Sequence, residues 1–83
     1  MCSNGVNTNQ LKSTIEMIDD EVALVRRWTH KTYHLAEGGG QARTAEVLKT
    51  VQSLLDDVRA ALTDAQDAVE KDDADDGVKI ELL

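Results

Sequence analysis

Three consecutive glycines, Gly38-Gly39-Gly40, divide the chain into two long stretches in which apolar residues recur every three or four positions. Glycine readily adopts the left-handed conformation that ends helices, and it destabilises a helix interior by about 1 kcal/mol per residue. The glycines therefore predict the end of one helix and a reversal of the chain. A connection this short makes the two flanking helices antiparallel neighbours.

The stretch before the glycines has the pattern of an amphipathic helix over residues 8–37. Asn7, followed three residues later by Gln10, is typical of a helix N-cap with its capping-box partner. Apolar or small residues then alternate at spacings of four and three, which is the seam of a coiled coil or helical bundle. The seam residues are Leu11, Ile15, Ile18, Val22, Val25, Thr29, Thr32 and Ala36.

The stretch after the glycines repeats this spacing and predicts a second helix over residues 41–72. Folding the chain about residue 40 brings Val25 near Leu55 and makes every layer between the helices apolar or small. The sequence therefore predicts an all-α fold, an antiparallel two-helix hairpin with coiled-coil-like packing. The seam of the second helix consists of Thr44, Leu48, Val51, Leu55, Val58, Leu62, Ala65 and Val69.

Further apolar residues beside both seams widen the apolar arc to about half of each helix's circumference. One partner helix does not cover so wide an arc, and large apolar patches mark interfaces. We therefore expect the hairpin to self-associate, with a dimeric four-helix bundle favoured over a higher helical oligomer. The alternative is a monomer that docks the same surface on a different protein. The expected interface residues are Met17, Leu24, Trp28, Leu35, Val47 and Leu54.

The two ends of the chain differ from the helical stretches in composition. Residues 1–7 are polar, which predicts a flexible N-terminal arm. Residues 73–83 form an acidic tail that ends in a short apolar peptide. Negative charge opposes the helix dipole at a C-terminus, so we expect the second helix to fray near Asp72 and to stop at Gly77. The alternating residues 78–83 suit an added β-strand or an extended peptide.

Composition narrows the functional classes. The 83 residues allow one domain, and the single cysteine, Cys2, allows no internal disulfide, so we expect a reducing, cytoplasmic location. The apolar runs are far shorter than the roughly 20 residues that span a bilayer, so no membrane partner is expected. Sixteen acidic residues against nine basic ones argue against a sequence-independent grip on nucleic acid.

Both histidines, the tryptophan and the tyrosine fall within residues 26–34. On a helical projection the arginines and histidines of this segment lie opposite the seam. In one interpretation Trp28 packs at an interface and the cations simply suit the dipole at a helix C-terminus. In the other, the cationic side binds an anion such as a nucleotide or an RNA loop. The expected anion-binding residues are Arg26, Arg27, Lys31, Tyr33 and His34.

His30 and His34 stand four residues apart, a helical metal-ligand spacing, with Glu37 one turn onward. Further ligands are hard to name, because Cys2 would have to come from the opposite end of the hairpin or from another subunit. We therefore expect an exposed histidine pair, with no metal and no other cofactor.

No residue pattern indicates catalysis, since the chain has no nucleophile–base spacing and no phosphate-binding loop attached to a strand. We expect a small non-enzymatic protein-binding regulator, adaptor or inhibitor that acts through a self-associating helical hairpin. One alternative is an oligomeric binder of an anionic ligand through residues 26–34, and another is a passive structural or scaffolding coiled coil. Acidic residues on the outer side of the second helix would also suit an inhibitor that occupies a basic groove. They are Asp56, Asp57, Asp64 and Asp67.

Overall fold

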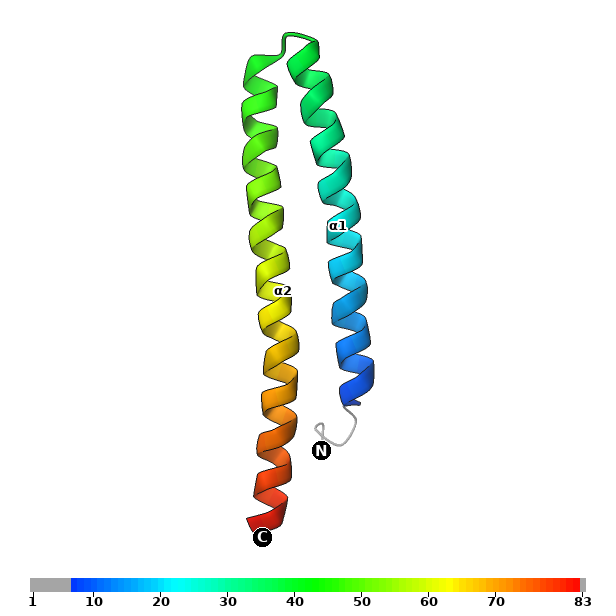
Figure 1. The fold of residues 1–83 in the computed structure, drawn as a ribbon, viewed down its shortest axis with the longest axis vertical. Coiled ribbons are helices and arrows are strands. Elements are labelled where there is room, and N and C mark those ends of the chain that lie inside the picture. The colour runs from blue at the N-terminus through cyan, green and yellow to red at the C-terminus, as the bar shows by residue number, and fades with distance from the viewer. Residues whose placement is uncertain (1–6, 83) are drawn as a thin grey trace.

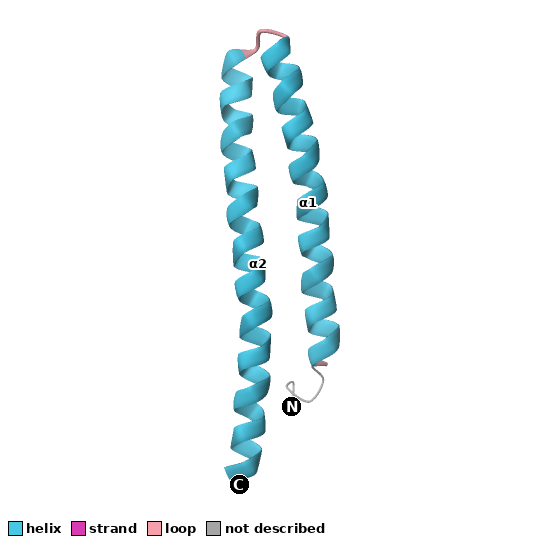
Figure 2. Cartoon of the chain, in the orientation of Figure 1, coloured by secondary structure: helices cyan, strands magenta, loops and turns pink. Residues whose placement is uncertain are grey.

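A computed structural model describes the backbone of residues 7–82 and the side chains of residues 7–73. The described chain forms two long antiparallel helices, α1 (Thr8–Gly38) and α2 (Ala42–Leu82), joined by a tight turn (Figure 1). No strand occurs in residues 7–82 (Figure 2). The predicted all-α two-helix hairpin is thereby confirmed. Over the same residues, neither helix contains an apolar stretch of the kind that crosses a bilayer.

The N-terminus of α1 is capped as its sequence predicts. Asn7 has an extended backbone, and its side chain accepts a hydrogen bond of 3.1 Å from the backbone N–H of Gln10. The first N–H groups of a helix have no partner within the helix, so this contact satisfies one that would otherwise depend on water. The predicted arm before Asn7 lies outside the described residues.

The chain leaves α1 through a Schellman motif. The backbone N–H of Gln41 donates to the carbonyl of Ala36 at 2.8 Å, and that of Gly40 donates to the carbonyl of Glu37 at 3.3 Å. Gly40 holds the left-handed conformation that this motif needs, with φ at 75°. Gly38, which we expected in the loop, is the last residue of α1. Of the three glycines, only Gly40 therefore has a positive φ that requires glycine.

This difference between the glycines predicts opposite effects of alanine. Gly40→Ala is expected to lower the free energy of unfolding by about 1–2 kcal/mol, because a Cβ disfavours the left-handed conformation. Gly38→Ala is expected to raise it by about 0.5–1 kcal/mol, since alanine favours the helix. A Cβ at Gly38 meets nothing within 4 Å. Urea unfolding followed by circular dichroism at one protein concentration measures both, and effects of the same sign would contradict the assignment.

The C-terminal part of the chain differs from its expected conformation. α2 continues past Asp72 and Gly77 to Leu82, so its backbone is helical where we expected fraying, a stop and then an extended peptide. A single internal glycine costs a helix about 1 kcal/mol, and an unfavourable charge near its C-terminus costs about 0.3–1 kcal/mol. Beyond Gly77, Lys79, Glu81 and Leu82 are good helix formers and offset part of these costs.

The two helices meet along a seam that is rotated from the predicted one. Every second predicted position is kept, as at Ile15 and Leu55. In α1 the positions between them are replaced by the next residue along the chain, whereas in α2 Val51 and Ala65 stay half-buried and the next residue joins them. Because successive residues lie about 100° apart around a helix, the change in α1 turns the centre of the contact by about 50°, and the change in α2 turns it by less. The shielded residues are Thr8, Lys12, Ile15, Asp19, Val22, Ala23, Arg26, Thr29, Tyr33 and Ala36 in α1, and Ala45, Leu48, Val51, Gln52, Leu55, Arg59, Leu62, Ala65, Gln66 and Val69 in α2.

The rotation corrects two of our expectations. Val25 and Ile18, which we placed in the seam, are 50% and 45% exposed. Arg26, which we placed opposite the seam, lies within it and pairs with Asp56 of α2. The reason is that the apolar arc is wider than one helix contact, so the hairpin can use one edge of the arc and leave the other edge open.

The single hairpin encloses very little core. Within the described side chains, the buried residues are Thr29, Ala36, Ala45 and Val69, and no large side chain is fully buried. Small domains depend on a sufficient apolar core for stability, and a pair of helices with four small or medium buried side chains does not supply one.

Candidate functional site

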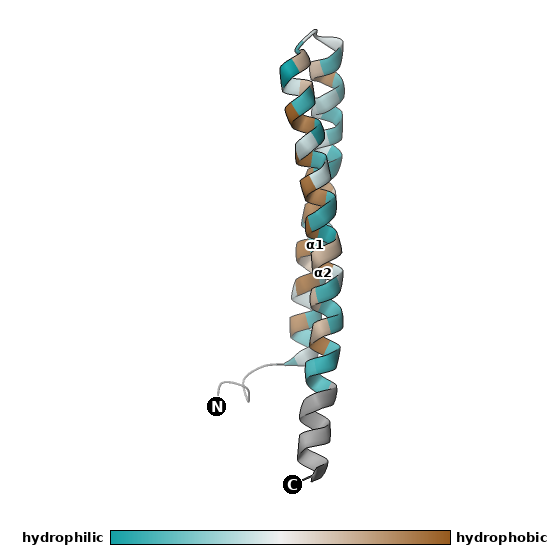
Figure 3. Cartoon of the chain, turned by 90° about the vertical axis from the view of Figure 1, so that its left-hand side faces the viewer, coloured by the Kyte–Doolittle hydropathy of each residue, from teal (hydrophilic) through white to brown (hydrophobic). Residues whose placement is uncertain are grey.

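One side of the hairpin is enriched in exposed apolar residues. Both seams are shifted toward the next residue along the chain, and in two antiparallel helices this leaves the unused apolar residues on the same side of the pair. In the edge-on view of Figure 3, brown gathers toward one side of the hairpin along its middle part and teal toward the other. We call the following exposed residues the apolar face: Leu11, Met17, Ile18, Leu24, Val25, Trp28, Leu35, Val47, Leu54 and Val58.

All six residues that we expected at an interface belong to this apolar face. Leu35 is 76% exposed, Met17 64% and Trp28 60%. Trp28 also lies beneath the ammonium of Lys31, whose Nζ is 4.9 Å from the ring centroid. A cation over an aromatic ring is a favourable contact, but it leaves most of the indole open to solvent. The predicted interface residues are thus uncovered in a single chain.

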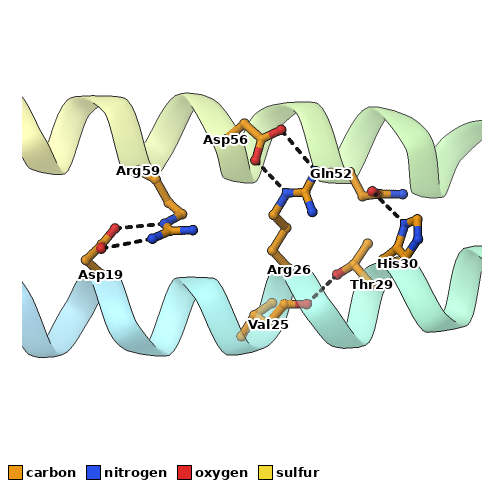
Figure 4. A network of polar contacts seen from close by, with 8 residues as sticks. All are labelled: Asp19, Val25, Arg26, Thr29, His30, Gln52, Asp56 and Arg59. Carbon is orange, nitrogen blue, oxygen red and sulfur yellow. Dashed lines mark hydrogen bonds and ion pairs between the residues drawn. The ribbon is translucent and has the colours of Figure 1, made fainter.

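The opposite side of the seam carries a row of polar contacts between the helices. Arg59 donates two hydrogen bonds to the carboxylate of Asp19, at 3.0 and 3.2 Å (Figure 4). Arg26 donates to Asp56 at 2.6 and 3.4 Å, and the ammonium of Lys12 lies 2.7 Å from a carboxylate oxygen of α2. Exposed ion pairs contribute little net stability. In this register and rotation, each of these cations lies beside a carboxylate of the other helix.

Two of these ion pairs change the pKa of a carboxyl group. The hydrogen bonds from Arg59 lower the pKa of Asp19 below its usual value of 3.8, and Lys12 likewise lowers the pKa of Glu70. A carboxyl with a lowered folded-state pKa stabilises the fold above its unfolded pKa, and it loses that contribution as the pH falls through the folded value. Both contributions are therefore present at neutral pH and disappear in acid.

Asp19→Asn is expected to destabilise the hairpin at pH 7 and to have a smaller effect at pH 2, because acid removes the charge on Asp19 that the hydrogen bonds from Arg59 stabilise. Urea unfolding at the two pH values measures the difference. Asp20→Asn is the matched control. Asp20 is an exposed neighbour, and its substitution removes the same charge without breaking the contact between Asp19 and Arg59. A loss of stability in Asp19→Asn that persisted unchanged at pH 2 would contradict this role.

The five expected anion-binding residues do not form one patch. Arg26 faces Asp56 across the seam, and Lys31 lies over Trp28 at the edge of the apolar face. The half-buried Tyr33 donates to the carboxylate of Glu37 at 3.0 Å, which raises the pKa of its phenol. Arg27 is exposed, and His34 lies beside the same carboxylate, 3.6 Å from it. Anion binding through this segment stays a prediction, with carboxylates close to three of its five residues.

A shallow hollow of about 260 Å³ lies beside the turn. Tyr33 and Glu37 of α1 and Glu46 and Lys49 of α2 contribute to its wall, and the ammonium of Lys49 lies 5.9 Å from the centre of the tyrosine ring. Its two carboxylates disfavour an anionic ligand. The hollow is therefore no better suited to phosphate than the surface around it.

The two histidine rings face one another on the polar side of α1. Their Nε2 atoms are 3.0 Å apart, and the rings meet edge to face at an interplanar angle of 85°. Nδ1 of His30 lies 3.2 Å from Oε1 of Gln52 on α2 (Figure 4), and Nδ1 of His34 lies 3.6 Å from Oε1 of Glu37. Sequence reasoning missed Gln52, because the predicted seam placed it outside the contact. The described residues contain no cluster of three or more potential metal ligands.

Comparison of the chain with protein-family models, curated proteins and solved structures finds no match.

Proposed function

We propose that this protein is a non-enzymatic binding protein whose hairpin pairs with a second copy through the apolar face. The resulting four-helix bundle would act as a protein-binding regulator, adaptor or inhibitor. The observation that carries the proposal is the set of ten large apolar side chains left exposed on a hairpin with almost no core of its own. Exposed apolar surface of this extent marks an interface.

The rotation of the seam supports a bundle of four helices. In a square bundle the direction from one helix to the bundle axis differs by about 45° from the direction to its neighbour. In α1 the apolar arc is turned from the intrachain contact by about 50°, as the shift of alternate seam positions implies, and in α2 it is turned in the same sense by a smaller angle. Both helices therefore direct apolar residues such as Ile18, Val25 and Val58 toward the place where the centre of a bundle would lie.

The energetics favour covering this surface. Burying one large apolar side chain completely contributes about 1.5–3 kcal/mol, so covering the exposed half of a residue such as Leu54 contributes about 1 kcal/mol. A two-fold arrangement covers the apolar face of both copies at once, because the two copies contribute the same surface. Self-association is thus the simplest source of the core that the single chain lacks.

The outer surface of such a dimer suits binding to a basic partner. Asp56, Asp57, Asp64 and Asp67 are all exposed on α2, and the chain carries a net charge of -7. Charge complementarity speeds association and selects partners, even where it adds little affinity. We propose a basic protein surface as the target of the regulator or inhibitor.

Sedimentation equilibrium over a range of protein concentrations tests the self-association. We expect a mass of about twice the 9.1 kDa of one chain. A mass of one chain at every concentration would contradict the bundle, and a mass that kept rising would favour a scaffolding coiled coil.

The binding role is tested by capture from native extract on immobilised protein at low and high salt. The expected result is a partner protein that is rich in basic residues, is retained at low salt and is released at high salt.

A further inference from the structure

We infer that His30 and His34 bind one divalent transition-metal ion of the Cu²⁺ or Ni²⁺ class through their two Nε2 atoms. This site lies on the polar side of the seam, so it does not depend on pairing through the apolar face. The two Nε2 atoms are 3.0 Å apart. The Nδ1 atom of His30 contacts Gln52, and that of His34 lies near Glu37.

The contact to Gln52 leaves the Nε2 of His30 with a free lone pair. Oε1 of an amide accepts hydrogen bonds and cannot donate one, so the Nδ1 atom of His30 carries the hydrogen in this 3.2 Å contact. A neutral imidazole has only one N–H, which leaves Nε2 deprotonated and able to bind a metal. The ring is thus oriented from the second helix.

The second ring lies beside a carboxylate. Nδ1 of His34 is 3.6 Å from a carboxylate oxygen of Glu37, which is too long for a hydrogen bond. Without metal, Nε2–H of His34 therefore donates to Nε2 of His30 across 3.0 Å, and a metal ion would displace that proton, move the hydrogen to Nδ1 beside Glu37 and bind both Nε2 atoms. Metal-bound histidines commonly donate their other N–H to an amide, carbonyl or carboxylate oxygen. Gln52 and Glu37 occupy these supporting positions.

The distance between the nitrogens selects the class of metal. With metal–nitrogen bonds of about 2.0–2.1 Å, two ligands at 90° are separated by about 2.9 Å and two ligands at the tetrahedral angle by about 3.3 Å. The observed 3.0 Å fits the 90° arrangement. Tetragonal coordination by nitrogen and oxygen is typical of Cu²⁺ and Ni²⁺, and Cu²⁺ also binds most tightly in the general order of divalent ions. Because both histidines are exposed, water completes the coordination.

Calorimetric titration with Ni²⁺ alone tests the site, using metal-free protein that carries Cys2→Ser to remove the only thiol. We expect one saturable ion per chain and a rise in the thermal midpoint, because the paired geometry exists only in the folded helix. His30→Ala and His34→Ala are each expected to abolish this binding. Circular dichroism of both variants checks that the helices remain.

The role of Gln52 has its own matched control. Gln52→Ala is expected to weaken Ni²⁺ binding about 10-fold, since supporting partners of metal-bound histidines have effects of 10- to 100-fold. Gln66→Ala, at another half-buried glutamine of the same seam in α2, is expected to leave the affinity unchanged. Absence of saturable binding in the Cys2→Ser protein, or equal binding by the histidine variants, would overturn the site. Equal affinity of Gln52→Ala and Gln66→Ala would overturn the positioning role.

Discussion

Trp28→Asp is expected to convert the assembled protein into a poorly stable monomer. Trp28 is the largest residue of the apolar face and is 60% exposed in a single hairpin. A carboxylate at this position would have to lose its hydration in a dry interface, which costs several kcal/mol without a partner. Two-fold symmetry places the same charge in both copies, so the penalty is counted twice.

Sedimentation equilibrium and thermal unfolding measure this effect. We expect the mass to fall to that of one chain and the thermal midpoint to fall with it, because the hairpin then loses the core that its partner supplies. Ser53→Asp is the matched control: Ser53 is exposed on α2, does not belong to the apolar face, and gains the same charge. An unchanged mass for Trp28→Asp would refute pairing through this face.

Leu55→Ala is expected to lower the free energy of unfolding by about 2–3 kcal/mol. Leu55 is half-buried and occupies a seam position that the predicted and the observed contacts share. Replacing a packed leucine by alanine removes apolar contact and leaves a cavity, and the usual cost is about 2–5 kcal/mol. The lower end applies because Leu55 is only partly shielded. In a small domain, this is a large share of the total stability.

The adjacent Leu54 provides the comparison, because it is 57% exposed and lies on the apolar face. Leu54→Ala is expected to weaken association, so it should destabilise an associated sample and have little effect in a dilute, monomeric one. Leu55→Ala also loosens the contact within one chain and should still destabilise a dilute, monomeric sample. Urea unfolding at two widely separated concentrations distinguishes them. Identical behaviour of the two variants would contradict the rotated seam.

The helices, their order and their antiparallel pairing could be predicted because each depends on local patterns. The spacing of Leu48, Leu55 and Leu62 specifies a helix whatever it packs against. Asn7 caps α1 through a neighbour three residues away. The glycines force a short connection, which leaves the helices no arrangement but an antiparallel one. All these interactions lie within a few residues along the chain.

The expected interface residues could be predicted in part for the same reason. Trp28 and Leu35 lie outside the narrow seam but inside the apolar arc, and a periodic pattern is enough to find such residues. The sequence could not predict that Arg26 lies in the contact between the helices while Arg27 lies in solvent. Adjacent residues on a helix differ by about 100°, so a rotation of half that amount moves one of them into the contact and leaves the other in solvent.

The sequence by itself determined the two helices, their capped start, the glycine turn and a wide apolar arc on each helix. Only the tertiary structure decided which edge of that arc faces the partner helix, because the arc is wider than one contact and periodicity has no preference among its parts. In the observed rotation Asp19 pairs with Arg59 and Arg26 pairs with Asp56. The same rotation brings Gln52 to His30 and leaves the apolar face uncovered. These are contacts between residues far apart in the chain, and they exist only once the hairpin has closed.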